Sequence, residues 1–535
     1  MNNIQLIDNE NMGQYIDRGN MGFREARKGE YVDKSGLISI INGTLCSEFK
    51  YSCVSRARRF GKSMAAKMLC AYYDRSCDSR ELFADLEIAR DPSFEEHLNK
   101  YPVIYLDLTA FATRFKKPNL VSLIDAELKK DIHEAYPDVP IPRGADLMDY
   151  LIRINVRKGD RFFFIIDEWD TICREFPQSS VMDEYVNWLR RMFKVVNAVD
   201  VFVGVYMTGI LPIKKYETQS ALNNFREYSM VMPRQLAKFY GFTKEEVQTL
   251  AVKYGMDFDE LEKWYDGYQI GSQPSMFNPN SVMEALSNDY CESYWGTTGA
   301  YDAVATYIKM NYEGLKDDII DMLAGGRCPV WVKAFSNDMH DVESRDDVLT
   351  VLIHLGYLSY DRETRQCNLP NREVADEMES AIKKNNWKPV IDALQQSERL
   401  LDDLFRGNAE AVASGVEVIH RQEASLFKYN DENSMACVIS LAFYAARNDF
   451  HVHREYQTGD GYADLVLIPR KNVSRPAVVI ELKYDKTVDT AISQIKQKHY
   501  PEKIQEYTGD ILLVGINYDQ DTKQHKCHIE RYIKD

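Results

Sequence analysis

The chain has 535 residues, of which 45% are hydrophobic and 28% are charged, and this composition is that of a folded protein rather than a disordered one. The length predicts two to four domains. No apolar run approaches the ~18 residues of a membrane span, and the first residues lack the charged and apolar blocks of a signal peptide. Ten scattered cysteines without a Cys-x-x-Cys pair are typical of reduced thiols. We therefore expect a cytoplasmic protein with no membrane partner.

The formal net charge of −16 argues against indiscriminate nucleic-acid binding, because phosphates would be repelled at long range. The charge is unevenly distributed. After residue 420 there are 16 Lys and Arg against 17 Asp and Glu, so the rest of the chain carries −15. A nearly neutral C-terminal part can still present a local basic face, so the charge weakens a nucleic-acid hypothesis without excluding it.

The first 230 residues alternate apolar, strand-like runs with helical stretches. Strands are predicted at residues 51–54, 103–108, 162–167 and 201–207, and a helix at residues 64–73. Continuous apolar runs separated by helices indicate a parallel sheet that is covered on both faces. The fold class predicted for this part is therefore α/β.

The rest of the chain has two further patterns. Residues 240–400 are mostly helical in pattern, and one helix opens with a capping box at Thr243 and Glu246. From residue 401 a compact α/β unit is predicted. Its elements are a helix at 431–447, strands at 452–457, 463–468 and 477–482, a helix at 487–507 and a strand at 511–516.

A candidate phosphate-binding loop follows the first strand and ends in Gly61-Lys62-Ser63. A loop between a strand and a helix turns backbone N–H groups inward, and the helix N-terminus adds partial positive charge. Gly61 allows close approach of the backbone, Lys62 can reach the β- and γ-phosphates, and Ser63 can ligate Mg²⁺. The first glycine of the usual motif is replaced by Arg56, so an ordinary basic turn before a helix is the alternative interpretation. The nucleotide-binding candidates on this loop are Arg58, Arg59, Phe60, Gly61, Lys62 and Ser63.

A second element favours nucleotide binding over the basic turn. Asp167 and Glu168 end a strongly apolar strand, where Asp167 can hold Mg²⁺ and Glu168 can polarise the attacking water. Acids at strand ends also occur as helix caps, but this combination with Gly-Lys-Ser rarely arises by chance. Thr208, at the end of the next strand, is a candidate to sense the γ-phosphate or orient water, and an ordinary turn residue is an equally good interpretation.

The C-terminal part carries the residue types of a metal-dependent phosphodiesterase. Asp464 lies on one predicted strand, and Glu481 and Lys483 lie on the next, two residues apart and therefore on one face. If the two strands pair, Asp464 and Glu481 can bind Mg²⁺ while Lys483 orients or helps to deprotonate water. A solvated sheet face is the alternative. The apolar run before Glu481 makes the catalytic interpretation the better one.

The chain resembles bacterial AAA-ATPase-like proteins with a C-terminal PD-(D/E)XK nuclease domain. The N-terminal matching segments are Tyr31-Val32-Asp33-Lys34, Arg58-Arg59-Phe60-Gly61-Lys62-Ser63, Ile166-Asp167-Glu168-Trp169-Asp170 and Met207-Thr208-Gly209. Those further along are Gly241-Phe242-Thr243, Trp264-Tyr265-Asp266-Gly267-Tyr268, Phe277-Asn278-Pro279 and Pro370-Asn371-Arg372-Glu373-Val374. Family members commonly have Pro where this chain has Ala57 and often Tyr where it has Trp169. Neither change removes a group that the phosphates need.

The resemblance adds three candidates around the C-terminal site. A helical Glu432 would supply a further metal ligand, as the helix before the first strand does in some members of this nuclease superfamily. Glu455, on the adjacent strand, competes for that role. Gln494 lies on the following helix, where the superfamily often places a polar residue near the site. Each has a surface position as the alternative interpretation.

The resemblance implies three domains: an AAA/P-loop ATPase-like domain at 1–240, a helical middle region at 241–400 that relays its state, and a PD-(D/E)XK nuclease-like domain at 401–535. The expected cofactors are ATP and Mg²⁺, with Mn²⁺ as a substitute, and the expected partner is nucleic acid, with DNA favoured over RNA. The main hypothesis is a nucleotide-dependent nuclease. The rival is a signalling or interaction ATPase whose C-terminal domain binds nucleic acid or protein without cutting. The sequence leaves the oligomeric state open.

Overall fold

The computed structural model describes residues 13–115, 119–177, 179–194, 201–213, 215–216, 219–220, 222–295, 301–310, 312–333, 335–336, 342–423, 432–457, 461–470, 473–498 and 509–532. The chain forms two compact units. Unit 1 comprises Met1–Cys291 and Trp331–Glu363, and unit 2 comprises Glu292–Val330 and Thr364–Asp535. The three domain boundaries expected from the sequence stay predictions.

Unit 1 is built around a five-stranded sheet with the strand order β2-β3-β4-β1-β7, in which every neighbouring pair is parallel. The strands are β1 (Tyr51–Ser55), β2 (Val103–Asp107), β3 (Phe162–Asp167), β4 (Phe202–Gly209) and β7 (Arg226–Tyr228). The predicted parallel α/β sheet is confirmed. Strand β7 was not predicted, because it is only three residues long and reads Arg-Glu-Tyr rather than as an apolar run.

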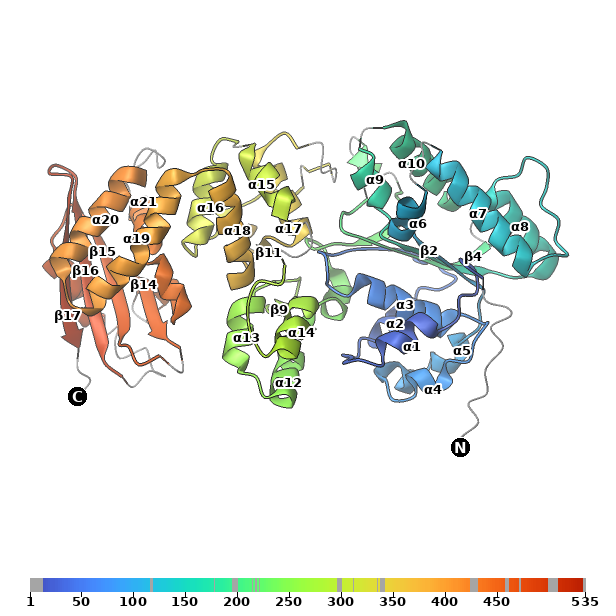
Figure 1. Cartoon of the computed structure of the whole chain (residues 1–535), viewed down its shortest axis with the longest axis horizontal. Coiled ribbons are helices and arrows are strands. Elements are labelled where there is room, and N and C mark those ends of the chain that lie inside the picture. The colour runs from blue at the N-terminus through green and yellow to red at the C-terminus, as the bar shows by residue number, and fades with distance from the viewer. Residues whose placement is uncertain are drawn as a thin grey trace. The chain divides into compact units, whose positions relative to one another are not determined.

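Helices cover both faces of this sheet (Figure 1). On one face lie α1 (Met21–Ala26), α2 (Gly36–Asn42), α3 (Lys62–Tyr73), α4 (Arg80–Phe83), η2 (Glu87–Arg90) and α5 (Phe94–His97). On the other lie α6 (Leu108–Arg114), α7 (Leu120–Ala135), α8 (Leu147–Lys158), α9 (Thr171–Glu175) and α10 (Ser180–Phe193). Consecutive residues of β3 serve the two faces, since Phe163 stacks on Tyr73 at 4.2 Å between ring centroids and Phe164 meets Phe193 at 5.8 Å.

The remainder of unit 1 is mostly helical, as the sequence pattern predicted. Its elements are β5 (Lys215–Tyr216), β6 (Gln219–Ser220), η3 (Arg234–Phe239), β8 (Phe242–Thr243), α12 (Lys244–Tyr254), α13 (Phe258–Tyr265), β9 (Met276–Phe277), α14 (Pro279–Asn288), α17 (Arg345–Leu355) and β11 (Ser359–Asp361). Helix α12 has the predicted capping box, in which Thr243 and Glu246 satisfy each other's backbone N–H groups. Glu246 also pairs with Lys34 at 2.7 Å, which joins this helix to the segment before α2.

Unit 2 contains helices and a second five-stranded sheet. The elements before that sheet are α15 (Tyr301–Lys309), α16 (Leu315–Leu323), β10 (Cys328–Pro329), β12 (Gln366–Asn368), α18 (Arg372–Lys384), α19 (Lys388–Phe405), α20 (Ala409–Glu423), α21 (Glu432–Ala442) and η5 (Tyr444–Asn448). The single helix predicted at 431–447 is therefore α21 followed by a 3-10 turn.

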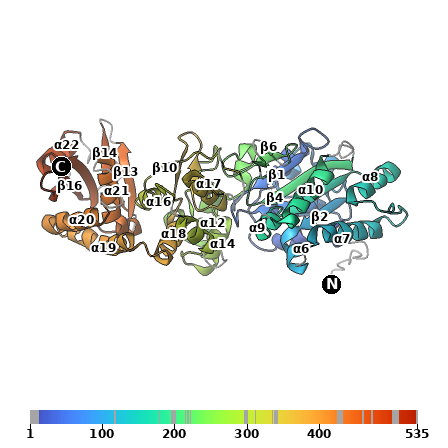
Figure 2. The ribbon, with the colours of Figure 1, turned by 90° about the horizontal axis from the view of Figure 1, so that it is seen from above.

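The second sheet has the order β13-β14-β15-β16-β17, with β15 and β16 parallel and the other pairs antiparallel. Its elements are β13 (Phe450–Gln457), β14 (Tyr462–Pro469), β15 (Ala477–Tyr484), α22 (Val488–Gln497), β16 (Ile511–Asp519) and β17 (Gln524–Tyr532). Figure 2 shows α19 and α20 on one side of the sheet and α22 on the other. The α/β order predicted for this part is confirmed, with β17 as an unpredicted fifth strand. Of the helix predicted at 487–507, α22 covers 488–497, and residues 499–508 lie outside the described ranges. Strand β17 was not predicted because its many polar residues give no apolar run.

None of the helices in the described ranges is both long and apolar enough to cross a bilayer.

Candidate nucleotide and metal sites

The phosphate-binding candidate is the loop between β1 and α3, as the sequence predicted. Gly61 is the N-cap of α3 and has φ 89°, a left-handed conformation that glycine adopts without strain. A Cβ added at Gly61 would meet no atom within 4 Å among the described residues, so the space in front of the helix N-terminus is open there. The first N–H groups of α3 have no intrahelical partner and carry partial positive charge, which favours an anion at this end.

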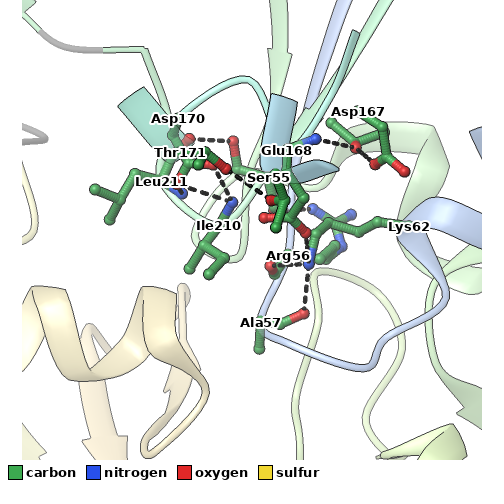
Figure 3. A network of polar contacts seen from close by, with 12 residues as sticks. Ser55, Arg56, Ala57, Lys62, Asp167, Glu168, Asp170, Thr171, Ile210 and Leu211 are labelled. Carbon is green, nitrogen blue, oxygen red and sulfur yellow. Dashed lines mark hydrogen bonds and ion pairs between the residues drawn. The ribbon is translucent and has the colours of Figure 1, made fainter. Parts of the chain in front are cut away.

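Lys62 is buried at the base of this loop, with only 4% of its side chain exposed. Its Nζ donates to the carbonyl oxygens of Arg56 and Ala57, both at 3.1 Å, and lies 3.7 Å from Oε1 of Glu168 (Figure 3). Burial lowers the pKa of Lys62, and the nearby Glu168 carboxylate partly opposes that effect. A phosphate at the loop would offer this ammonium group a stronger partner than two neutral carbonyls.

The two acidic candidates lie at the end of β3, next to Thr208 at the end of β4. Thr208 Oγ1 donates to Oδ1 of Asp167, and Tyr105 donates to Oδ2 at 3.1 Å. Strand β4 lies between β1 and β3, so the parallel sheet brings Lys62, Asp167 and Thr208 to one edge. The structure thus brings together residues from three separate segments of the chain, while the roles predicted for them stay predictions.

Glu168 has a left-handed backbone, with φ 55°, and a carboxylate between two cations. Its Oε1 faces Lys62, and its Oε2 lies 3.0 Å from Nη2 of Arg174. Burial raises the pKa of Glu168, and Lys62 and Arg174 act against that rise. The partly buried carboxylate of Glu168 thus lies next to the loop lysine, and its predicted role in polarising water stays a prediction.

Asp170 is a residue of this site that sequence reasoning missed. It is fully buried and accepts hydrogen bonds from the backbone N–H groups of Ile210 and Leu211, at 3.2 and 3.1 Å (Figure 3). It therefore ties the turn after β3 to the turn after β4. The run Asp-Glu-Trp-Asp was visible in the sequence, but nothing local indicated a partner forty residues away.

Arg56, which stands where the usual motif has glycine, is a fully buried structural cation. Its Nη1 donates to the carbonyl oxygens of Ser55 and Tyr228, at 2.9 and 2.8 Å, so it connects β1 to β7. The guanidinium lies 5.2 Å from the centre of the Tyr240 ring, and burial lowers its pKa to about 10. Nε and Nη2 of Arg56 have no hydrogen-bond partner among the described residues.

The remaining loop candidates occupy the rim and floor of the loop. Arg58, Arg59 and Ser63 are half-buried, and Arg59 has a left-handed backbone with φ 67°. Phe60 is fully buried and meets the ring of Tyr268 edge-on at 5.1 Å. Phe60 therefore anchors the loop to the fold, and its predicted contact with nucleotide stays a prediction.

In unit 2, Asp464, Glu481 and Lys483 converge on one face of the second sheet. Strands β14 and β15 pair antiparallel through Leu465 and Ile480, and Asp464 and Glu481 are the next residue along on each strand. Asp464 Oδ2 accepts the backbone N–H of Leu482 at 2.7 Å. Lys483 Nζ donates to Oε1 of Glu481 at 2.8 Å. The predicted pairing of the two strands is therefore present.

The Glu481 carboxylate has the electrostatics of a cation-binding group. It is 2% exposed, and burial and the Asp464 carboxylate together raise its pKa to about 7, against the lowering effect of Lys483. Its Oε2 is buried and has no hydrogen-bond partner among the described residues. A divalent cation would satisfy this oxygen and relieve the repulsion from Asp464, so the residues fit the predicted metal. In the described part of the chain, no group of three or more His, Cys, Asp or Glu forms a metal-binding cluster, so the fit rests on two carboxylates.

The three additional candidates differ in their placement. Gln494, on α22, donates from Nε2 to Oε1 of Glu481 and so lies at the site, as expected. Glu455 is exposed, with φ 48°. Glu432 begins α21, and its side chain lies outside the described residues.

Two parts of the chain match known families. Residues 19–218 match the family described as predicted AAA-ATPase, and residues 430–528 match the PD-(D/E)XK nuclease superfamily. The matches confirm the resemblance expected from the sequence.

The chain is also similar to individual proteins. A protein of Azotobacter chroococcum mcd 1, described as an uncharacterized protein in the vnfD 5′ region, is 22% identical over 534 residues, which cover 94% of this chain and 96% of that protein. Among solved structures, Cdc6p from Pyrobaculum aerophilum is 10% identical, with a TM-score of 0.25 over 68% of this chain and 93% of that chain. The ORC2 protein of Aeropyrum pernix is 14% identical, with a TM-score of 0.30 over 70% and 97%. These TM-scores are too low for a functional comparison.

Proposed function

We propose that this chain, which carries an AAA-ATPase-like domain and a PD-(D/E)XK superfamily domain, is an ATP-binding and ATP-hydrolysing protein that cleaves nucleic acid with a divalent metal. The observation that carries the cleavage proposal is the convergence of the half-buried Asp464 with the buried Glu481 and Lys483 on one sheet face. Support for the ATPase comes from Lys62 and Glu168, which meet at the edge of the first sheet.

At the first site, the residues suit ATP with Mg²⁺. Lys62 would exchange its two loop carbonyls for the β- and γ-phosphates, and Ser63 and Asp167 would hold the metal. The metal would neutralise phosphate charge when bound. Glu168 would orient and polarise water, and Thr208 would keep the Asp167 carboxylate in place through its hydrogen bond.

At the second site, Asp464 and Glu481 would hold Mg²⁺ or Mn²⁺, which supplies charge stabilisation at the scissile phosphate. Lys483 would orient the attacking water and neutralise charge that develops on the phosphate. Gln494 donates from α22 to Glu481 and so fixes the position of that carboxylate. The substrate is nucleic acid, with DNA favoured over RNA.

The rival function is a signalling or interaction ATPase whose second domain binds without cutting. The net charge of −16 favours it, because an acidic protein gains little from long-range attraction to phosphates. The Asp464, Glu481 and Lys483 set favours cleavage, because a surface that only binds has no need of a buried Glu481 carboxylate whose ionisation is opposed by the half-buried Asp464 carboxylate beside it.

The test is cleavage of a panel of single- and double-stranded DNA and RNA, with Mg²⁺ or Mn²⁺ and with or without ATP. Asp464→Ala and Glu481→Ala serve as variants at equal folded concentration. We expect the parent to cut and both variants to lose cleavage while retaining ATP hydrolysis. Variants that cut as well as the parent would place the activity elsewhere, and a parent that cuts under no condition would favour the rival.

A further inference from the structure

Arg174, on α9, lies one helical turn after Asp170 and makes a forked contact with two acids. Its Nη2 lies 3.0 Å from Oε2 of Glu168, and its Nε lies 3.1 Å from Oδ2 of Asp170. The same Nη2 donates to Oγ1 of Thr171 at 3.2 Å. The side chain is 18% exposed, so this ion-pair cluster is shielded from solvent more than a surface pair would be.

The side of the guanidinium that contacts Asp170 is anchored to the interior of the fold. Asp170 is fully buried, and it also accepts the backbone N–H groups of Ile210 and Leu211. The position of Arg174 is therefore tied to the turns after both β3 and β4. A planar guanidinium can bridge two acids in fixed geometry, whereas a lysine ammonium is a single point on a flexible stem.

The Glu168 carboxylate is held between Arg174 and the loop lysine. Its Oε1 faces Lys62 Nζ at 3.7 Å, and its Oε2 faces Arg174. In the proposed ATP complex, Lys62 contacts the phosphates instead of Glu168. Arg174 is then the cation that keeps its contact with Glu168 and fixes the direction of the carboxylate.

We propose that Arg174 is a positioning residue for ATP hydrolysis, which holds the Glu168 carboxylate in the orientation that activation of water requires. This inference rests on the proposed ATPase function. Arg174 touches neither the phosphates nor the water in this scheme and acts through Glu168. Substitution of Arg174 should therefore lower the rate of ATP turnover and leave nucleotide binding unchanged.

The experiment measures steady-state ATP hydrolysis against ATP concentration for the parent, Arg174→Ala and Arg174→Lys. A misplacement of about 1 Å in a catalytic group can cost ~10²-fold, so we expect Arg174→Ala to lower kcat by roughly 10-fold or more and to leave KM within about twofold. Arg174→Lys should retain an intermediate kcat, since it keeps the charge but not the fork. Arg157→Ala, which removes an exposed arginine from α8, is the matched control and should behave like the parent.

A double-mutant comparison separates positioning from general damage. In a Glu168→Gln background, Arg174→Ala should cause little further loss in single-turnover hydrolysis, because the group on which Arg174 acts is already gone. Equal losses in both backgrounds would overturn the inference, as would an unchanged or raised kcat in Arg174→Ala. If Arg174→Ala does not fold, Arg174→Lys is compared in the parent and Glu168→Gln backgrounds in its place, and the same outcomes support or overturn the inference. A parent without ATP turnover would contradict the proposed ATPase function and this inference with it, whereas an active parent with insensitive Arg174 variants would contradict the inference alone.

Discussion

Glu481→Gln should stabilise the metal-free protein at neutral and alkaline pH, although it removes a proposed metal ligand. Burial and the Asp464 carboxylate raise the pKa of Glu481 from 4.5 to about 7. The folded state therefore resists ionisation of Glu481, whereas the unfolded state does not. Glutamine has nearly the shape of the protonated acid and never ionises, so it escapes that cost.

The size and sign of the effect follow from the two pKa values. The stability of the parent that is linked to Glu481 is fully present below pH 4.5 and is lost as the pH rises towards 7. A shift of about 2.5 units at 1.36 kcal/mol per unit gives an order-of-magnitude loss of about 3 kcal/mol above pH 7. The free energy of unfolding of Glu481→Gln should thus exceed that of the parent by little near pH 4.5. The difference should grow through pH 7 and then level off.

The assay is urea unfolding of parent and variant in EDTA at several pH values between 4.5 and 8.5, followed with a probe in the C-terminal domain because a multidomain chain need not unfold in one step. Addition of Mg²⁺ should stabilise the parent and not the variant, since binding to the native state adds stability. An advantage that is independent of pH, or one that shrinks as the pH rises, would refute the reasoning about Glu481.

Three further outcomes are expected. Lys62→Ala should abolish or greatly weaken ATP·Mg²⁺ binding in a calorimetric titration, and an affinity equal to that of the parent would contradict the loop assignment. Glu168→Gln should bind ATP normally but release phosphate on the order of 10²-fold more slowly, or more slowly still, and unchanged release would make Glu168 a structural residue. Lys483→Ala should keep Mn²⁺ binding, measured by calorimetry, while it loses most cleavage. Retention of full cleavage would show that Lys483 does not act on the water or the phosphate.

Local patterns in the sequence were enough to predict the main elements and to single out the candidate site residues. The apolar run of β3 and the Gly-Lys-Ser loop are each continuous in the chain, so their strand, turn and helix start are encoded by neighbouring residues. The two-residue spacing of Glu481 and Lys483 puts both on one face of any strand, whatever the rest of the fold does. The convergence of Asp464 with them needed only that two adjacent strands pair.

Contacts between distant segments were decided by the tertiary structure alone. Nothing near Asp170 in the chain indicates that it accepts the N–H groups after β4, because that bond depends on β4 lying beside β3. The bridge from Arg56 to Tyr228 likewise needs β7 beside β1, and β7 has no apolar run to reveal it. The raised pKa of Glu481 arises from burial under α22 and from Asp464 across the sheet. Residue type and spacing specify which groups can react, whereas strand order and burial set their partners and their charge, since both depend on packing between parts of the chain that are far apart in sequence.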